Sequence, residues 1–189
     1  PIAVQTMLDP ADCGPACISL SQDIQGQTFD YPAEFFQERV HTIRRPRPDE
    51  FQIKEAAEKI KSSKNPIIIS GGGVFYSDAM EELSQFAIKH NIPVTQTVMG
   101  YSTMKRDHSH FAGQIGGLGG KNTNTLAKET DLAIAVGTKL ADFTTGSWAN
   151  FENENFKLVS INVSRYDANK HLAQAVVGDA KVSLTELSQ

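Results

Sequence analysis

A glycine run that follows a β-branched run contains the residues best suited to bind a charged ligand. Residues 67–69 are isoleucines, and Gly71, Gly72 and Gly73 come one residue later. This pattern is typical of a buried parallel strand ending in a loop where backbone approaches another group closely. A helix starting after such a loop would complete a phosphate cradle, because free amides and the helix dipole favour an anion. Tyr76 stands where the dinucleotide fingerprint has its third glycine, so that match is incomplete.

Two other groups invite a metal interpretation. Residues 107–110 read Asp-His-Ser-His, and alternate residues of an extended chain share a face. That loop has no evident third ligand, so we expect no metal there. Cys13 and Cys17 could form half of a metal site, but no second Cys/His pair follows at zinc spacing. We therefore expect both cysteines to be packed, reduced thiols, as free cysteines often are.

The remaining histidines and the one tryptophan suggest structural roles. His41, His90 and His171 are isolated, and we expect them to be structural or solvated. Trp148 lies in a polar stretch, where a large apolar side chain is expected to anchor a domain contact rather than to bind a cofactor. Ser70 is not in a Gly-x-Ser-x-Gly elbow. The chain alone therefore shows no complete catalytic constellation.

Composition narrows the function classes. The chain has 189 residues, of which 40% are hydrophobic, and this is enough to bury a sizeable core. Its net charge of −4 argues against a general nucleic-acid binder, which would carry a basic stripe. No run reaches the roughly 18–20 apolar residues of a membrane span. The cysteine content does not suggest a disulfide framework, so we expect a reducing, cytoplasmic location.

Three regions separate along the chain. Residues 1–36 contain one short apolar strand, predicted at residues 16–20, which cannot bury itself and is expected to belong to a neighbouring domain. Residues 37–50 have the composition of a linker, with the basic, proline-rich run at residues 44–48 expected to lie as a solvated strap on a domain surface. Residues 51–189 form the main predicted domain.

Strand and helix patterns alternate in that main domain. Asp49 and Gln52 predict a capping box for a helix with one apolar face, and Asp78 and Glu81 predict another, which opens a helix over 78–90. The inner stripe of the second helix is predicted to be Met80, Leu83, Phe86 and Ala87. Further helices are predicted at about 122–130 and from Asp179. Strands are predicted at residues 67–70, 94–98, 132–136, 158–163 and 175–177. This alternation predicts an α/β fold, with an open, mainly parallel, Rossmann-like sheet covered by helices on both faces.

Ligands of such sheets bind outside the carboxyl ends of the strands. An NAD-type site would also need an acidic residue about 20 positions after the glycines, and residues 95–97 are Thr-Gln-Thr instead. We therefore expect at most a vestigial nucleotide pocket, with no catalytic and no metal-ligating residue. The residues that would line it are Gly71, Gly72, Gly73, Met99, Gly100, Gly137 and Asn162.

Five segments, in order, resemble one enzyme family. Residues 13–24 resemble the Gly-Pro…Asp-Ile close of the pyrimidine-binding domain in thiamine-diphosphate enzymes of the acetolactate synthase type. Residues 66–73 resemble the first strand and glycine turn of their central domain. Residues 98–100 with Asp107 and His108, residues 131–139 and residues 177–180 are similar to its later landmarks. The resemblance covers nearly the whole chain and implies a Rossmann-like central domain with the tail of a preceding domain.

Residues 30–36, 44–48 and 161–171 further resemble the inositol-catabolic trihydroxycyclohexane-dione hydrolases. That resemblance implies a homo-oligomeric carbon–carbon hydrolase of carbohydrate metabolism that opens a small cyclic 1,2-dione to 5-deoxy-glucuronate with thiamine diphosphate and Mg²⁺. Its activating glutamate would lie upstream and its Gly-Asp-Gly motif downstream. The only Gly-Asp pair here, Gly178-Asp179, is followed by Ala180. We therefore expect this chain to be a piece of a larger protein, with its pyrimidine- and diphosphate-binding domains missing, and to be inactive alone.

Two alternatives remain open. A nucleotide-binding module would hold an ADP moiety at residues 71–73, and an acetohydroxyacid synthase-like domain would hold FAD there. The flavin-containing relatives usually have aspartates where this chain has Asn162 and Ser164, so the resemblance implies that bound FAD or ADP is not expected.

Overall fold

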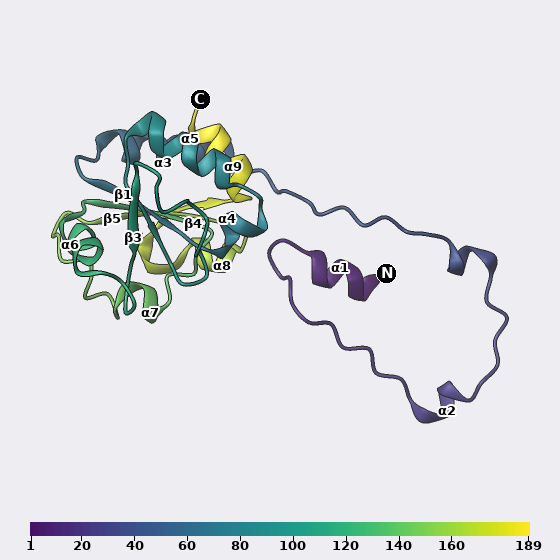
Figure 1. Cartoon of the computed structure of the whole chain (residues 1–189). Helices are drawn as coiled ribbons and strands as arrows, with labels where there is room; N and C mark the ends of the chain where they lie inside the picture. Colours follow the sequence, from purple (N-terminus) through teal and green to yellow (C-terminus); the bar gives the residue numbers. More distant parts are fainter. The chain divides into compact units, whose positions relative to one another are not determined.

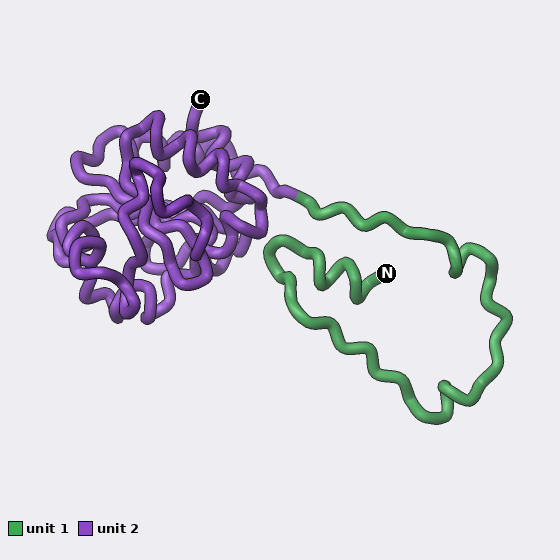
Figure 2. Tube along the Cα trace, viewed as in Figure 1, with its two compact units in different colours: residues 1–44 green, residues 45–189 purple.

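The computed structural model describes all 189 residues and divides into two compact units. The N-terminal unit is Pro1–Arg44 and the sheet unit is Arg45–Gln189 (Figure 2). None of the helices combines the length and apolarity that crossing a bilayer requires. The division into residues 1–36, 37–50 and 51–189 stays a prediction.

The sheet unit contains six strands in one parallel sheet, in the order β3-β2-β1-β4-β5-β6. The strands are β1 (Pro66–Ser70), β2 (Val94–Gln96), β3 (Phe111–Gln114), β4 (Leu132–Val136), β5 (Lys157–Asn162) and β6 (Gln174–Val177). Every residue of β4 is buried, as expected for a strand covered on both faces. The predicted α/β fold with an open parallel sheet is confirmed.

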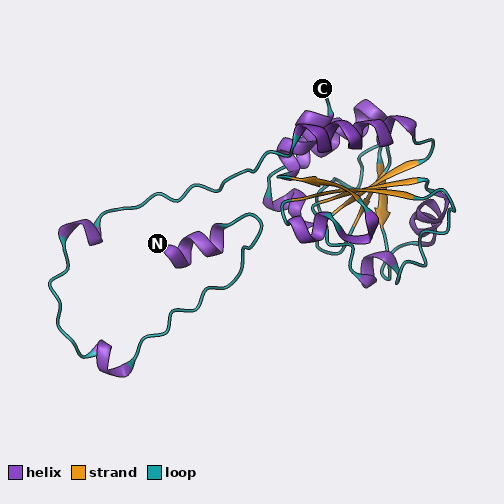
Figure 3. Ribbon diagram, turned by 180° about the vertical axis from the view of Figure 1, so that it is seen from behind, coloured by secondary structure: helices purple, strands orange, loops and turns teal.

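Helices cover the two faces unequally. In Figures 1 and 3, α3 (Glu50–Ser62), α5 (Met80–His90) and α9 (Ala180–Leu187) lie together on one face, while α6 (Lys121–Glu129) and the short α7 (Asp142–Thr145) lie on the other. The first face packs Ala56, Leu83, Phe86 and Leu184 against β1 and β4. On the second face, aromatic loop residues take the place of further helices. These are Trp148, Phe151 and Phe156.

Three of the four predicted helix starts agree with the structure, those of α3, α6 and α9, and the one at Asp78 is wrong. Asp49 caps α3 by accepting from Phe51 N at 2.9 Å, and Asp179 caps α9 through Lys181 N and Val182 N. Gln52 does not complete the predicted capping box, because its Oε1 accepts from Val177 N instead, at 2.9 Å. Asp78 caps no helix, so the helix start predicted there is wrong.

The chain forms α4 (Gly72–Tyr76), turns with Asp78 at φ 53°, and begins α5 two residues later. The Asp78 side chain lies instead 3.6 Å from Lys181 Nζ. Leu83, Phe86 and Ala87 are buried as predicted, but Met80 at the first turn is 36% exposed.

Strand β3 is not among the strands predicted from the sequence. It is a half-buried edge strand whose Gly113 has φ 104°, and its pairing with β2 shifts register there. The glycine hides the strand pattern, because glycine weakens a strand locally and often marks a bulge. Strand β2 also ends two residues earlier than predicted.

The basic run at residues 45–48 lies on the sheet unit as a strap. Arg45 Nη1 donates to Asp179 Oδ2 at 3.2 Å and to Ser77 O, and Arg47 Nε donates to Glu186 Oε1 at 2.9 Å. The backbone carbonyl of Pro46 accepts from Asp179 N at 2.8 Å. The surface-strap prediction is therefore confirmed for these residues, and both arginines have carboxylate partners.

The N-terminal unit contains α1 (Ile2–Leu8), α2 (Gln22–Gln25) and the 3₁₀ turn η1 (Ala33–Phe36), and no residue in it is buried. The strand predicted at residues 16–20 is absent, because this unit offers no second strand to pair with it. Cys13 and Cys17 are free and exposed, so the prediction of packed thiols is wrong for this chain. Exposed aromatic rings cluster in the unit; they are Phe29, Tyr31, Phe35 and Phe36.

Candidate functional site

The carboxyl ends of all six strands meet at one edge of the sheet, and the strand order reverses between β1 and β4. In open α/β sheets this switch point is where ligands bind. The fold brings the predicted residues to this edge, since residues 71–73 follow β1, Met99 and Gly100 follow β2, Gly137 follows β4, and Asn162 ends β5.

At the switch point, the glycine loop packs backbone to backbone against the loop after β4. A Cβ atom added to Gly73 would lie 2.6 Å from the Cα of Gly137, and one added to Gly71 would collide with the Gly137 carbonyl. Gly137 itself has φ 59°, a conformation that glycine adopts without strain. The close approach that the glycine run predicts is therefore an approach to protein backbone.

The amides of that loop are also occupied. Gly71 N donates to Val136 O and Gly73 N donates to Gly137 O, each at 2.9 Å. A phosphate cradle depends on free amides that point at the ligand. Two of the three glycine amides are thus already used to join the loop after β1 to the end of β4 and to the loop that follows it.

The loop after β2 closes the edge further. A side chain at Gly100 would collide with the carbonyl of Ser70, and Gly100 N donates to Thr97 O at 3.1 Å. Met99 is 70% exposed, while its backbone oxygen would lie 3.3 Å from a Cβ on Gly72. Met99 therefore contributes an exposed side chain to the rim rather than a wall to a pocket.

A buried hydroxyl network lies beneath this loop, and the sequence analysis missed it. Ser70 Oγ donates to Thr95 O at 3.1 Å and lies 2.7 Å from Thr103 Oγ1, which donates to Gly100 O at 2.8 Å. Gln96 Nε2 donates to Met104 O at 3.0 Å. The three side chains that make these bonds, those of Ser70, Gln96 and Thr103, are at most 2% exposed, so they stabilise the loop and are not available to a ligand. The Thr-Gln-Thr sequence, noted only for lacking a carboxylate, was the signal for it.

Asn162 is fixed by two hydrogen bonds that need an amide. Its Nδ2 donates to Thr138 O at 3.2 Å and its Oδ1 accepts from Ser164 N at 2.9 Å. An aspartate could accept from Ser164 but could not donate to Thr138. Ser164 in turn caps the short α8 (Arg165–Ala168), accepting from Asp167 N. The amide at residue 162 therefore joins the loops after β4 and β5.

The histidine pair at residues 107–110 has protein partners. His108 Nε2 lies 2.9 Å from Ser84 Oγ, its Nδ1 accepts from His110 N at 3.1 Å, and His110 Nε2 lies 3.1 Å from Asn91 Oδ1. No three histidine, cysteine, aspartate or glutamate side chains of the chain gather where they could hold a metal ion.

Trp148 packs within the sheet unit. Its ring lies 5.4 Å from Phe151 and 4.3 Å from His171 between centroids. Burial and the charge of Lys170 lower the pKa of His171, with Asp142 opposing the shift. His171 is an exposed residue whose ring lies beside Trp148, which agrees with the predicted structural or solvated role.

Two solved structures share this architecture. One is benzoylformate decarboxylase from Polynucleobacter necessarius, with a TM-score of 0.74 and 22% identity over 97% of this chain and 34% of that one. Another is a putative thiamin diphosphate-dependent enzyme from Mycobacterium smegmatis, with a TM-score of 0.63 and 21% identity over 79% of this chain and 29% of that one. At these identities the likeness concerns the fold.

The family is shown by sequence. Residues 53–187 match the model of the thiamine pyrophosphate enzyme central domain, and the chain belongs to that family. It is 44% identical over 185 residues to the 3D-(3,5/4)-trihydroxycyclohexane-1,2-dione hydrolase of Clostridium perfringens, and 45% identical to hydrolase 1 of that name from Bacillus cereus. Each match covers 98% of this chain, which spans 29% of the length of these relatives.

Proposed function

We propose that this chain is the central, non-catalytic scaffold of a thiamine-diphosphate-dependent hydrolase that opens 3D-(3,5/4)-trihydroxycyclohexane-1,2-dione to 5-deoxy-glucuronate in myo-inositol catabolism. The identity of 44–45% to hydrolases of that dione supports the parent activity. The family model, a central domain, supports the position within the parent. The chain alone is then inactive.

One observation carries the scaffold role. The switch-point edge, where an open α/β sheet would bind its ligand, is filled by the contact between residues 71–73 and Gly137. We infer that the residues predicted to line a nucleotide pocket form a vestigial one, whose glycines now serve loop packing. FAD and ADP are accordingly not expected as ligands.

In this proposal, the cofactor of the parent enzyme binds to the other domains of the polypeptide. The edge offers no free glycine amide pair and no cluster of metal ligands, so its residues do not fit a diphosphate with a divalent cation. Thiamine diphosphate and Mg²⁺ would instead be held by pyrimidine- and diphosphate-binding domains of the same polypeptide, in a cytoplasmic homo-oligomer.

The N-terminal unit fits the same proposal. We propose residues 1–36 as the tail of the pyrimidine-binding domain, residues 37–50 as a linker and residues 51–189 as the central domain. The absence of buried residues in Pro1–Arg44 supports this division, because its apolar side chains need a neighbour to cover them. The largest are exposed by more than half, among them Ile18, Leu20, Phe29 and Phe36.

A thermal-shift titration tests the scaffold role. The chain is heated with ADP, FAD, NAD, CoA or thiamine diphosphate with Mg²⁺, and a ligand of the folded state at a hundredfold excess over Kd would stabilise it by about 2.7 kcal/mol. We expect no shift with any of them. The second candidate function is an acetohydroxyacid synthase-like domain that binds a nucleotide, and the gathering of the predicted pocket residues at one edge of the sheet favours it. A clear shift with ADP or FAD would contradict the scaffold role and support this second function.

The parent activity needs its own assay. The dione is given to the chain alone and to the parent polypeptide, each with thiamine diphosphate and Mg²⁺, and the acid product is measured. We expect product from the parent only. Failure of the parent to open the dione would contradict the assigned reaction and leave the scaffold role standing, whereas product from the chain alone would contradict the scaffold role.

A further inference from the structure

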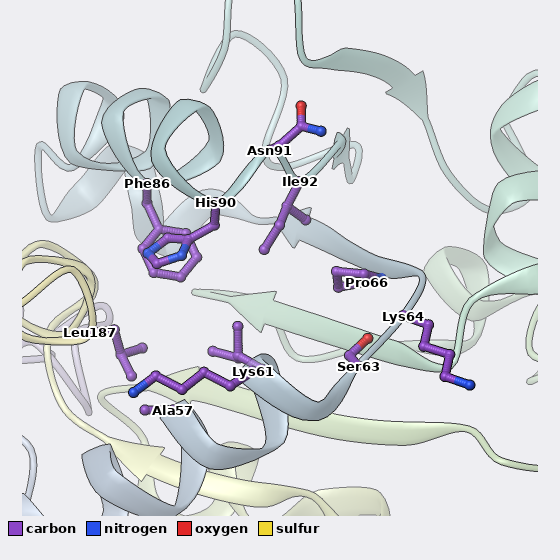
Figure 4. Close-up of a pocket in the computed structure, with 11 residues that line it drawn as sticks. Ala57, Lys61, Ser63, Lys64, Pro66, Phe86, His90, Asn91, Ile92 and Leu187 are labelled. Atoms are coloured by element: carbon purple, nitrogen blue, oxygen red, sulfur yellow. The ribbon is translucent and has the colours of Figure 1, made fainter.

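A cavity of about 400 Å³ lies at the opposite end of the sheet, beside the amino end of β1 (Figure 4). Its walls come from the last turns of α3, α5 and α9 and from the turns that lead into β1 and β2. The volume falls within the range of about 300–1,000 Å³ that is usual for small-molecule sites. Nothing in the proposed scaffold role uses this end of the sheet.

The lining combines an apolar wall with basic groups. Ala57, Ile60, Phe86, Ile92 and Leu187 supply the apolar surface. The other lining residues include two lysines and a histidine but no aspartate or glutamate, although acidic residues outnumber basic ones in the chain by 22 to 18. Lys61, Lys64 and His90 therefore give the cavity a positive character.

Two of those basic groups are available to a ligand. Figure 4 shows Lys61 extended toward Ala57 and Leu187 and the His90 ring over Phe86, and the two rings have centroids 4.5 Å apart. Lys64 points away from them. Neither Lys61 nor His90 has an ion-pair partner, whereas the neighbouring Lys89 donates to Ser188 O.

Helix ends alone could explain basic residues here, because cations are favoured near C-termini. However, several last-turn carbonyls already have partners. Ser63 N donates to Ile60 O, Asn91 N to Ile88 O and Ile92 N to Ala87 O. The carbonyl groups at the ends of these helices are therefore partly hydrogen-bonded already. This leaves the Lys61 ammonium group free to bind a ligand.

We propose that this cavity binds a small amphiphilic carboxylate, with its acid group between Lys61 and His90 and its apolar body against Phe86, Ile60 and Leu187. A charge-assisted hydrogen bond would hold one end of the ligand. Apolar burial would hold the other and would exclude compact, fully hydrated anions.

The electrostatics of His90 agree with this arrangement. Burial and the charges of Lys89 and Lys61 lower the pKa of His90. The other charged residue of the cavity lining is Lys64 on the α3–β1 turn, and Leu187 lines the cavity from α9. The same turn holds the Asp131 carboxylate through Ser63 and the amides of Lys64 and Asn65. A bound carboxylate would offset the lysine charges and raise the pKa of His90, so binding should tighten as the pH falls.

The probe is benzoate, added to the 189-residue chain while the His90 ring is followed by NMR, with His90→Gln used to assign its signals. We expect a saturable change and a higher His90 pKa with benzoate, and neither with benzyl alcohol, which has no charge, nor with inorganic phosphate, which has no apolar body. No saturable change with benzoate would overturn the proposal. An equal response to phosphate would mean that the cavity attracts anions in general, and this result would also overturn the proposal.

Matched lysine variants locate the site. Lys61→Met should weaken benzoate binding about tenfold, as expected for one lost charge-assisted hydrogen bond. Lys64→Met removes the same charge from the side chain that points away, and should leave the affinity unchanged. Equal affinities in both variants, or an equal loss in both, would contradict the placement at Lys61. Because both lysines are exposed, circular dichroism should report an intact fold in each.

Discussion

At the carboxyl ends of the strands, backbone packs on backbone, whereas at the amino ends three helix termini stand apart around a cavity. Gly73 and Gly137 approach so closely that neither accepts a side chain, and their loops share hydrogen bonds. At the other end, Ala57 and Lys61 face open space of about 400 Å³. The end where topology predicts a ligand is thus the more tightly closed one.

A glycine run therefore indicates that another group lies close to the backbone, but it does not indicate whether that group is a ligand or another part of the protein. The same three glycines suit a phosphate cradle or a loop–loop contact, because both require backbone without a Cβ atom. The two uses are distinguished by the partners of the amides, which the loop after β4 supplies here.

The largest expected effect is at the closed end. Gly137→Ala places a Cβ atom 2.5 Å from the Gly73 Cα in a residue with φ 59°. We expect about 2–4 kcal/mol of destabilisation from overpacking and left-handed strain. Gly120→Ala is the control, because a Cβ there meets nothing within 4 Å, and it should change stability by less than about 1 kcal/mol. Urea unfolding measures both, and equal stabilities would mean that the two loops separate readily.

Asn162→Asp tests the closed end by changing a hydrogen-bond donor to an acceptor, with almost no change in side-chain size. The change replaces the donor to Thr138 O with a carboxylate oxygen in a side chain that is 9% exposed. We expect a loss of about 2 kcal/mol in unfolding free energy at neutral pH, since a buried carbonyl loses its partner and faces an acceptor. Asn162→Ser keeps a short polar side chain without the charge and should cost less. If ADP instead raised the melting temperature of the Asn162→Asp variant, a single substitution would be enough to make this edge of the sheet bind a nucleotide.

Sequence patterns predicted most of the sheet but little of the packing at its ends. The isoleucines of β1 and all of β4 were found because buried parallel strands are continuous apolar runs. Strand β3 was missed because Gly113 interrupts its pattern, and the Asp78 cap was wrong because a left-handed turn there separates α4 from α5.

The strand pattern predicted that the candidate residues lie at one edge of the sheet, but not which groups they contact there. The fold gathers Gly73, Gly137 and Asn162 at one edge, as strand order requires, yet their partners are backbone atoms of other loops. The cavity at the other end was not foreseen, because its walls come from α3, α5 and α9, and His90 carries no local signal of it. Such contacts depend on tertiary packing, which a local pattern does not encode.

At the amino end, a single carboxylate holds the turn into β1. Asp131 accepts from Lys64 N at 2.8 Å, from Asn65 N at 3.0 Å and from Ser63 Oγ. Burial alone would raise the pKa of Asp131, but these hydrogen bonds together lower it from its ordinary value of 3.8. The stability they provide is therefore present above that value and is lost as the pH falls through the folded-state pKa.

We expect Asp131→Asn to lower the unfolding free energy at pH 7 by about 1–2 kcal/mol, because the amide keeps only one acceptor oxygen. As the pH falls from 3.8 through the folded-state pKa of Asp131, the difference from the unchanged chain should shrink. Urea unfolding across pH 3 to 7 measures it. A difference that is constant with pH would show that the carboxylate charge does not stabilise the turn.

The substitution with the smallest expected effect on stability, Ala57→Leu, gives the most direct contrast with Gly137→Ala. Ala57→Leu adds three carbons at a wall of the open cavity, where the side chain can extend beside Ile60, Phe86 and Leu187. We expect stability to stay within about 1 kcal/mol or to rise slightly, because added apolar surface is buried without displacing backbone. The same variant should weaken benzoate binding by filling its site. Destabilisation as large as that of Gly137→Ala would mean that the helices close the amino end as tightly as the glycines close the carboxyl end, and the contrast between the two ends would be lost.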